Sequence, residues 1–159
     1  MIIRTYRESD REALKEITIT CFDGNSSIDH NMESLFGLVD GRDWKWRKRL
    51  HMDSDIAANA AGIFIAEIEG RPVGYINTRI DHETRIGYIP HMAVLPAHRR
   101  IGIGRKLLDS AVAFLRDQGM SHVRISTLET NSPSQQLYSS YGFKEVSRQI
   151  HYMMQIEDK

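Results

Sequence analysis

Residues 94–108 read VLPAHRRIGIGRKLL and place two glycines and several cations between a predicted strand and a predicted helix. Gly102 and Gly104 allow other atoms to approach the backbone closely, and the first amides of a helix have no partners within it. These amides and the positive end of the helix dipole favour an anion. The segment therefore predicts a turn that binds a pyrophosphate, with added charge from Arg99, Arg100, Arg105 and Lys106.

Two other phosphate-binding motifs do not fit this segment. A dinucleotide fingerprint needs a third glycine where this chain has Leu107, and no GxxxxGK(S/T) string occurs in the sequence. For the segment taken alone, a glycine turn with a basic helix start and no ligand is an equally good interpretation. Other parts of the sequence are therefore needed to choose between a pyrophosphate-binding turn and a turn without a ligand.

The flanking sequence predicts a strand before the turn and a helix after it. Residues 85–94 have strand character, and Leu95-Pro96 ends the strand. After the turn, Gly119 supplies a helix stop, and apolar residues recur at helical spacing at Leu107, Leu108, Ala111, Val112 and Leu115. Residues 123–128 predict the next strand, so this part of the chain forms a β-α-β crossover.

The amino-terminal part predicts a strand, a helix and then a less regular region. Residues 2–6 have strand propensity, and Ser9 to Glu12 match a capping box with Ser9 at the N-cap of a helix that runs to Cys21. Residues 23–60 show no dominant period. They predict an irregular helical flap with short helices at 32–39 and 44–50.

The remaining segments complete a mixed α/β layer. Residues 62–69 and 73–80 predict a β-hairpin around a turn at 70–72. Ser132, with proline next and glutamine three residues on, predicts a helix N-cap, and Gly142 ends that helix. Residues 143–156 predict one or two closing strands, and their candidates for burial are Phe143, Val146, Ile150 and Tyr152.

Length and composition narrow the function further. The 159 residues predict a single domain spanning 1–159, and 21 basic against 21 acidic residues leave no overall charge to attract nucleic acid or anionic lipid. The sequence has no apolar window long enough to span a membrane and no secretory signal at its start. Cys21 is the single cysteine, so we expect no disulfide, no bound metal and a cytoplasmic location.

Two motifs together resemble the GNAT superfamily of acetyltransferases. Arg99 to Gly104 fits the family's (Gln/Arg)-x-x-Gly-x-(Gly/Ala) element, and Asn131 with Leu137-Tyr138 and Gly142-Phe143 fits its N...LY..GF element. Each motif follows a predicted strand and precedes or opens a predicted helix. The resemblance is close over about the last seventy residues, whereas residues 1–60 share only the broad layout.

The resemblance implies a fold and a set of site residues. The fold would be a mixed, mostly antiparallel central sheet, flanked by helices and splayed between its two central strands, so that the pantetheine of acetyl-CoA lies in the wedge. The Met92 amide would bond the thioester carbonyl, and Tyr138 would protonate the departing CoA thiolate. The implied cofactor-binding residues are Met92, Ala93, Val94, Arg99, Arg100, Ile101, Gly102, Ile103, Gly104, Arg105, Asn131, Ser134 and Tyr138.

The general base is missing from its usual places in this family. Some relatives carry glutamate where this chain has Tyr88, and relatives that acetylate protein N-termini carry glutamate where it has Ser126. His91 and Glu129 are the nearby candidates. Strand alternation puts His91 on the face opposite Tyr88 unless a bulge intervenes, and both candidates could instead be an ordinary sheet histidine and a solvated carboxylate.

The sequence therefore predicts an enzyme that transfers acetyl from acetyl-CoA to a primary amine of a small molecule or a protein terminus. The chain could assemble as a homodimer. An acyl-CoA-binding domain without turnover and a nucleic-acid module are the competing interpretations, and the second rests only on the basic run 98–106. The acceptor contacts could come from the flap, which contains Asp23, Asp29, His30, Glu33, Trp44 and Trp46.

Overall fold

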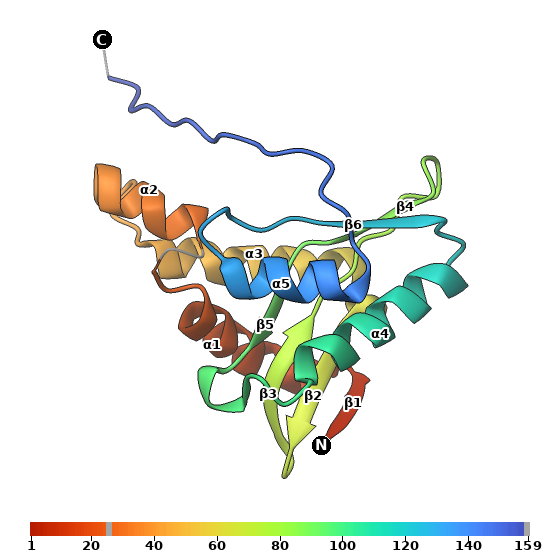
Figure 1. The fold of residues 1–159 in the computed structure, drawn as a ribbon. Coiled ribbons are helices and arrows are strands. Elements are labelled where there is room, and N and C mark those ends of the chain that lie inside the picture. Colours follow the sequence, from red (N-terminus) through yellow and green to blue (C-terminus); the bar gives the residue numbers. More distant parts are fainter. Residues whose placement is uncertain (25–26, 158–159) are drawn as a thin grey trace.

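The computed structural model describes residues 1–24 and 27–157 (Figure 1). Short 3-10 turns at Glu8–Asp10, Ala60–Gly62 and Pro96–His98 join some of the regular elements. In chain order those elements are β1 (Ile2–Thr5), α1 (Arg11–Cys21), α2 (Ile28–Phe36), α3 (Trp44–Asn59), β2 (Phe64–Ile68), β3 (Arg71–Ile76), β4 (Ile86–Ile89), β5 (Met92–Val94), α4 (Ile103–Asp117), β6 (His122–Ile125) and α5 (Ser132–Tyr141).

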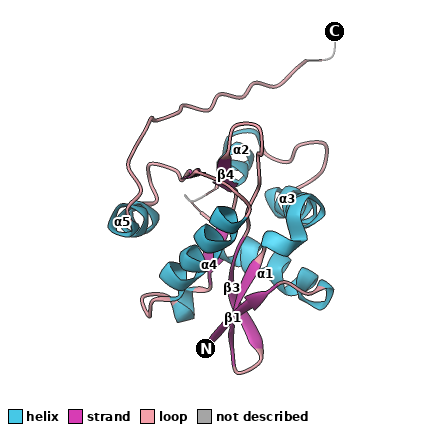
Figure 2. Cartoon of the chain, turned by 90° about the vertical axis from the view of Figure 1, so that its right-hand side faces the viewer, coloured by secondary structure: helices cyan, strands magenta, loops and turns pink. Residues whose placement is uncertain are grey.

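The strands form a mixed sheet. β1, β2, β3 and β5 pair antiparallel in that order, and β4 pairs parallel with β6. A bridge between Arg79 and Tyr88 joins the two parts. Figure 2 shows α4 on one face of the antiparallel strands and α1 with α3 on the other. The predicted mixed, mostly antiparallel sheet flanked by helices is confirmed.

The predicted strand 85–94 contains a β-bulge that divides it into β4 and β5. Met92 lies opposite Ile76, and the Asn77 amide donates to the His91 carbonyl at 2.9 Å. Arg79 and Tyr88 then exchange both backbone hydrogen bonds, at 2.7 and 3.0 Å. Between these pairs one residue, Thr78, faces two, Ile89 and Pro90, which is the count that defines a bulge. A proline suits this position because it donates no amide hydrogen.

The sheet splays at the bulge. β4 pairs with β6 as far as Ile89 and Ile125, whereas β5 is the last strand of the antiparallel part and pairs with β3. We call the region between the outer edge of β5 and the end of β6 the wedge. Figure 1 shows α5 crossing in front of this region.

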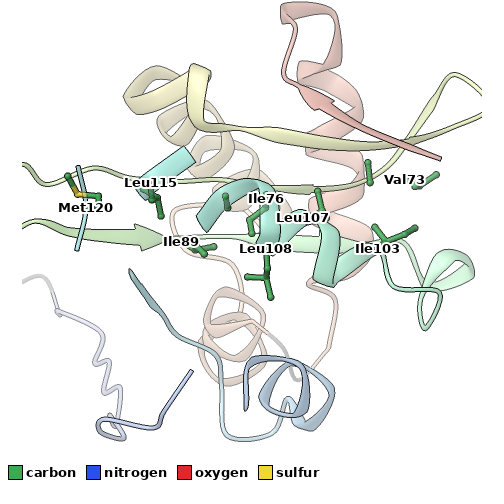
Figure 3. Close-up of a cluster of buried hydrophobic side chains, with 10 residues drawn as sticks. Val73, Ile76, Ile89, Ile103, Leu107, Leu108, Leu115 and Met120 are labelled. Atoms are coloured by element: carbon green, nitrogen blue, oxygen red, sulfur yellow. The ribbon is translucent and has the colours of Figure 1, made fainter. Parts of the chain in front are cut away.

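Two buried clusters hold the helices to the sheet. Figure 3 shows the first, in which Ile103, Leu107, Leu108 and Leu115 of α4 pack on Val73, Ile76 and Ile89. The second joins α1, α3 and the opposite face through residues that include Leu14, Ile17, Met52, Ile56, Ile65 and Tyr75. Apolar residues at helical spacing therefore orient α4, as its sequence predicts.

The predicted capping box is wrong. The helical region begins at Glu8 rather than after Ser9, and the Asp10 carboxylate accepts the Arg7 amide at 2.8 Å. Asp10 rather than Ser9 provides the capping side chain, because its carboxylate also accepts two hydrogen bonds of 2.8 Å from Arg4. A charge-assisted pair with two bonds outweighs a neutral serine cap.

Other boundaries also differ from those predicted. α2 begins at Ile28 and α3 runs to Asn59, so the flap is more regular than its sequence suggests. The hairpin turn lies at Glu69 and Gly70, which both have positive φ angles of 50° and 75°, and β3 therefore starts at Arg71 and ends at Ile76. A two-residue turn with this backbone matches the twist of the flanking strands.

The predicted closing strands at 143–156 are absent from the described structure. After Gly142, the chain through residue 157 has no regular secondary structure and runs away from the body (Figures 1 and 2). Phe143 is half-buried, but Val146 is 94%, Ile150 76% and Tyr152 90% exposed. The alternating apolar pattern is that of a strand, but no strand lies beside it among the described residues.

Candidate functional site

The predicted pyrophosphate turn is the N-terminus of α4. Gly102 is the N-cap residue in the left-handed conformation with φ of 87°, and no side chain caps the helix. The first helical hydrogen bond runs from the Lys106 amide to the Gly102 carbonyl at 3.2 Å. The amides of residues 103–105 therefore point out of the helix end, where they can donate to an anion.

Gly104 brings three elements together at this turn. A β-carbon on Gly104 would lie 3.0 Å from Leu137 Cδ2 of α5 and 3.9 Å from Met92 Cε of β5. A side chain here would press α5 away from α4. Gly102 has open space around it, so glycine is needed there for its positive φ angle. At Gly104, glycine is needed because neighbouring atoms pack closely.

The four cations near the turn have different environments. The Arg99 Nε donates to the Val94 carbonyl at 2.8 Å, which fixes the end of β5 to the turn. The Arg105 guanidinium lies 5.3 Å from the centre of the Tyr141 ring. All four side chains are exposed, Arg100 and Lys106 among them. The sequence alone does not show that Arg99 bonds the protein backbone.

The outer edge of β5 turns backbone groups toward the wedge. The His91 carbonyl and the Leu95 amide bond β3, at Asn77 and Val73, each at 2.9 Å. Because backbone groups alternate along a strand, Met92 and Val94 direct theirs to the opposite edge. No strand pairs with that edge in the part of the chain that the structure describes.

Tyr138 lies on α5 above this edge. Its side chain packs on the same buried cluster as Met92 and Leu137, and its ring meets Phe143 edge-on at 5.9 Å. Burial raises the pKa of the Tyr138 phenol, while a hydrogen bond from Ser134 opposes this shift. Tyr138 is therefore protonated at neutral pH.

Asn131 and Ser134 position the start of α5. The Asn131 Oδ1 accepts the Ser134 amide at 3.4 Å, so Asn131 is the N-cap and the prediction that Ser132 has this place is wrong. An amide side chain reaches the third helical residue in the same way as a serine hydroxyl. α5 then begins one residue after the cap, with Pro133 in its first turn.

The bulge places His91 on the same sheet face as Tyr88. Residues directly opposite each other in antiparallel pairs share a face, and Arg79 opposite Tyr88 shares one with Asn77 opposite His91. The hydrogen bonds of Asp55 confirm that these residues share the face covered by α3. Asp55 of α3 accepts from Asn77 Nδ2 at 2.7 Å and from Arg79 Nη2 at 2.6 Å.

His91 and Asp55 form a close pair. His91 Nδ1 lies 2.6 Å from Asp55 Oδ2, and Asp55 is only 4% exposed. Burial alone would raise the pKa of the Asp55 carboxyl, but the hydrogen bonds from His91, Arg79 and Asn77 together lower it. Because the ionised carboxylate accepts the Nδ1 proton, the neutral imidazole keeps an acceptor lone pair on Nε2.

Further polar groups surround this pair on the α1 and α3 side. The His51 ring stacks on His91 with centroids 6.3 Å apart, and the Phe22 ring meets His91 edge-on at 5.7 Å. Burial lowers the pKa of His51 and of Lys48, and Asp29 opposes both shifts from 3.6 Å. We call Asp29, Lys48, His51, Asp55 and His91 the polar cluster.

Sequence reasoning missed Asp55 and the polar cluster around it. Trp44, Lys48, Met52, Asp55 and Ile56 are all buried and recur at helical spacing along α3. Lys48 and Asp55 are polar residues within an otherwise apolar stripe, and this pattern could have identified them as site candidates from the sequence. The predicted helix ended at residue 50, so Asp55 was never placed on it.

Glu129, the other candidate base, lies in an exposed loop. Its side chain is 77% exposed and pairs with Arg148, and its carbonyl accepts from Gln135 Nε2 at 2.7 Å.

The hydroxyls of Tyr88 and Ser126, which stand where some relatives carry glutamate, lie 3.5 Å apart. Tyr88 also borders a surface hollow of about 410 Å³ together with Arg79, Ile80, Asp81, Thr84, Ile86 and Arg124.

Most of the flap residues named from the sequence have structural partners. The Glu33 carboxylate accepts the Trp44 amide at 2.5 Å, and the His30 ring meets the Trp44 ring at 5.5 Å. Asp23 lies 3.4 Å from His30 Nε2, and the Arg42 guanidinium lies over the Trp46 ring at 4.7 Å. Asp29 is buried against Arg47 and Lys48.

The described residues contain neither a metal-ligand cluster nor a membrane-spanning helix. No group of three or more His, Cys, Asp or Glu side chains is arranged to hold a metal ion. No helix is both long and apolar enough to cross a bilayer. Both statements concern residues 1–24 and 27–157 alone.

Comparison with known proteins identifies relatives. An N-alpha-acetyltransferase of Sulfurisphaera tokodaii is 34% identical over 109 residues, which cover 62% of this chain and 65% of that one. A mycothiol acetyltransferase of Thermomonospora curvata is 35% identical over 92 residues, 58% of this chain and 31% of that one. The matches thus span less than two thirds of either relative.

Solved structures share the fold. The PaiA N-acetyltransferase of Thermoplasma acidophilum in complex with coenzyme A superimposes with a TM-score of 0.72 at 20% identity, over 90% of this chain and 89% of that one. The family model described as the acetyltransferase (GNAT) family matches residues 13–143, which is most of the chain. The chain therefore belongs to the GNAT acetyltransferase family.

Proposed function

We propose that this chain works as one N-acetyltransferase domain that transfers acetyl from acetyl-CoA to a primary amine by direct attack. The observation that carries the proposal is the outer edge of β5, which runs from the His91–Asp55 pair past Met92 and Val94 to the helix end at Gly102. Donor groups for a thioester, a pantetheine and a pyrophosphate thus follow one another along a single stretch of chain.

The residues present fit acetyl-CoA as the donor. The uncapped amides of residues 103–105 suit its pyrophosphate, and the exposed cations Arg100 and Lys106 add charge beside them. Gly104 keeps this helix end tightly packed on β5 and α5. Val94 presents backbone groups at the strand edge, where the amides of pantetheine can bond as another strand would. Arg99 supports the turn through Val94 rather than as a ligand.

Met92 is proposed to stabilise charge on the thioester carbonyl. Attack by an amine places negative charge on that oxygen, and a backbone amide at the wedge edge can donate to it. Removing one well-placed donor of this kind typically costs about 2.7–4 kcal/mol of activation free energy. A strand backbone holds the donor rigidly, so little reorganisation is needed during the reaction.

His91 is proposed as the general base. Asp55 holds Nδ1, which orients the ring and leaves Nε2 to accept the amine proton. The side chain is 17% exposed, so the ring is partly accessible while its partner is buried. Glu129 is a weaker candidate because it pairs with Arg148 in an exposed loop.

Tyr138 is proposed as the general acid. Its raised pKa keeps the phenol protonated, and proton donation to a leaving thiolate is typically worth about 10²- to 10⁴-fold in rate. In this proposal the base acts from the sheet and the acid from α5.

The acceptor is proposed to be a primary amine of a small molecule or a protein terminus. The proposed cellular location is the cytoplasm. The names of the two relatives cover both acceptor classes. An α-amine has a pKa near 8 and a lysine near 10.4, so at pH 7 roughly a tenth of the former but under a thousandth of the latter is neutral. A single histidine base therefore favours an α-amine.

The test is release of CoA thiol from acetyl-CoA in the presence of a panel of amines. The panel contains peptides with free α-amines, the same peptides blocked at the terminus but bearing lysine, and small polyamines and amino sugars. We expect release well above hydrolysis with at least one unblocked amine. Binding of acetyl-CoA with no release for any amine would instead indicate an acyl-CoA-binding domain without turnover.

A further inference from the structure

A row of three side chains crosses the sheet beside the proposed base. Arg79 lies opposite Tyr88 in the antiparallel bridge, and Tyr88 lies opposite Arg124 in the parallel pair of β4 with β6. Residues opposite each other on paired strands share a sheet face, so all three lie on the face that also carries His91. We call Arg79, Tyr88 and Arg124 the cationic row.

The cationic row is close enough to the base to contact the same small molecule. Asn77 is opposite His91 and Arg79 is opposite Tyr88, so two residues of β-type chain separate the base from the row. At about 3.4 Å per residue this separation is about 7 Å, and Arg124 lies one strand spacing, about 4.8 Å, to the side. Backbone positions therefore place Arg124 about 8 Å from the base.

The row also lines the surface hollow of about 410 Å³ that Tyr88 borders. Ile80 and Ile86 add apolar side chains to its walls, and Ile86 is 40% exposed. Figure 1 shows β4 and β6, which carry Tyr88 and Arg124, side by side. A hollow of this size, with apolar walls and a few polar groups, has the properties of a site for a small organic group.

Two of the charged groups in the hollow already have partners in the chain. The Arg79 Nη2 donates to Asp55 at 2.6 Å. The Asp81 carboxylate accepts the amides of Glu83 and Thr84 at 3.0 and 3.2 Å, so it caps its own turn. These two charges are therefore held by neighbouring residues of the protein.

Arg124 has a different environment. Its side chain is exposed, and within residues 1–24 and 27–157 no carboxylate forms an ion pair with it. The guanidinium lies over the Tyr88 ring, 4.7 Å from the centroid. Stacking on an aromatic ring restricts an arginine while its N–H groups remain able to donate in the plane. Arg124 is thus a positioned cation without an anion.

We propose that the acceptor is an amine that carries a carboxylate or a similar anion several bonds away, an inference that rests on the proposed function. Arg124 binds the anion while the amine lies at His91. A guanidinium offers two parallel N–H donors that match the two oxygens of a carboxylate. Ile80 and Ile86 contact the aliphatic chain between the two charged ends. Such an acceptor is a small amino acid of sufficient length or a peptide with an acidic residue next to its terminus.

The first test measures binding without turnover. The probes are 5-aminopentanoate and 5-aminopentanamide, which differ in the anion, each added to the protein in the presence of CoA. We expect the NMR signal of the Arg124 Nε–H group to shift with the carboxylate and not with the amide. Arg124→Gln should weaken binding of the carboxylate about tenfold. Arg116→Gln, on an exposed pair with Asp117, is the matched control and should bind as the original chain does.

The second test measures the preference in turnover. Three peptides with alanine first and glutamate, glutamine or arginine second are compared by kcat/KM for thiol release. The original chain should prefer the glutamate peptide about tenfold over the glutamine peptide, and Arg124→Glu should prefer the arginine peptide instead. The ratio of kcat/KM for 5-aminopentanoate and the glutamate peptide tells which of the two sources supplies the anion.

The outcomes separate this inference from the function on which it rests. Turnover at equal rates for the glutamate and glutamine peptides, or a preference that Arg124→Glu leaves unchanged, would overturn the inference and keep the acetyltransferase. Shifts at Arg124 with the carboxylate alone but no turnover of any amine would support the anion site and contradict the proposed function. An Arg124 signal that moves with neither probe would overturn the anion site.

Discussion

At the scale of single residues, the candidate site depends on a carboxylate that does not touch the reacting atoms. Asp55 binds His91, Asn77 and Arg79, and is thereby a positioning residue for the proposed base. A buried carboxylate held by three donors stays ionised, and only the ionised form fixes one tautomer of the imidazole. The proposed base is therefore a pair of residues from different elements.

The variant Asp55→Asn tests this role. An amide keeps the shape but can donate to His91 Nδ1, so we expect turnover to fall about 10²-fold or more while the KM for acetyl-CoA is unchanged. ¹⁵N chemical shifts of the His91 ring should report protonated Nδ1 in the original chain and protonated Nε2 in the variant. Asp53→Asn, two residues earlier and paired with Arg11 and Lys15, is the matched control.

His91→Gln is expected to lose as much turnover as Asp55→Asn, because the pair acts as a unit. The combined variant should then lose little more than either single change. If Glu129→Gln lowers turnover more than His91→Gln, the base is Glu129 and the tautomer argument is wrong. Rates are measured by thiol release at saturating amine.

Tyr138→Phe tests the proposed acid. The ring that packs with Phe143 stays, but the phenol hydrogen is removed. We expect turnover to fall about 10²-fold or more while acetyl-CoA affinity, measured by calorimetry, is nearly unchanged. A comparable loss of affinity would show that Tyr138 holds the donor rather than protonating its thiolate.

At the scale of elements, the proposed donor site depends on the junction of β5, α4 and α5. Gly104→Asp adds a carboxylate where a β-carbon alone would meet Leu137 at 3.0 Å, and its charge opposes a pyrophosphate at the helix end. We expect acetyl-CoA binding to be lost. Ser110→Asp, on the same helix but a turn and a half further on, should bind normally. Retained affinity in Gly104→Asp would place the pyrophosphate elsewhere.

The sequence predicted the elements whose own pattern determines them. The spacing of Leu107 to Leu115 and the two glycines defined α4, because an amphipathic helix with a clear start is a local property. From the sequence, the bulge at Ile89 and Pro90 was only an alternative to regular alternation, because the register of a strand depends on its partner strand. Asp55 was missed because the predicted helix ended at residue 50, and no local pattern links it to His91, which lies 36 residues away.

Residues 143–156 show the opposite limit of sequence reasoning. Their alternation predicts one or two strands, but the described structure has none there, and the burial predicted for Val146, Ile150 and Tyr152 is wrong. Period-two patterning states that one face should be covered, but it does not state which molecule covers it.

At the scale of the whole molecule, stability depends on pH through buried carboxylates. The Arg4 hydrogen bonds lower the pKa of Asp10 against the effect of burial, and Asp10 is 5% exposed. A carboxyl whose pKa is lower in the folded state stabilises the fold above its unfolded value near 3.9, and this stabilisation is lost as pH falls further. The pair also joins β1 to the start of α1.

Asp10→Asn should lower the free energy of unfolding by about 1.5–3 kcal/mol at pH 7, because it removes the charge of the carboxylate that accepts from Arg4 and from the Arg7 amide, while Glu67 still pairs with Arg4. Below about pH 3 the difference from the original chain should shrink, since both then lack the carboxylate. Urea unfolding at several pH values measures both quantities. Asp117→Asn, on an exposed pair with Arg116, should behave as the original chain throughout. A constant difference at every pH would assign the loss to packing instead.

The bulge explains why two residues of odd separation lie on one side of the sheet. Tyr88 and His91 are three positions apart, so uninterrupted alternation would put them on opposite faces. Excising Pro90 would leave Ile89 alone opposite Thr78 and would keep Tyr88 opposite Arg79, so no side chain of β4 would change faces. Homologous chains that lack this extra residue should therefore show regular alternation of apolar and polar letters from β4 through β5.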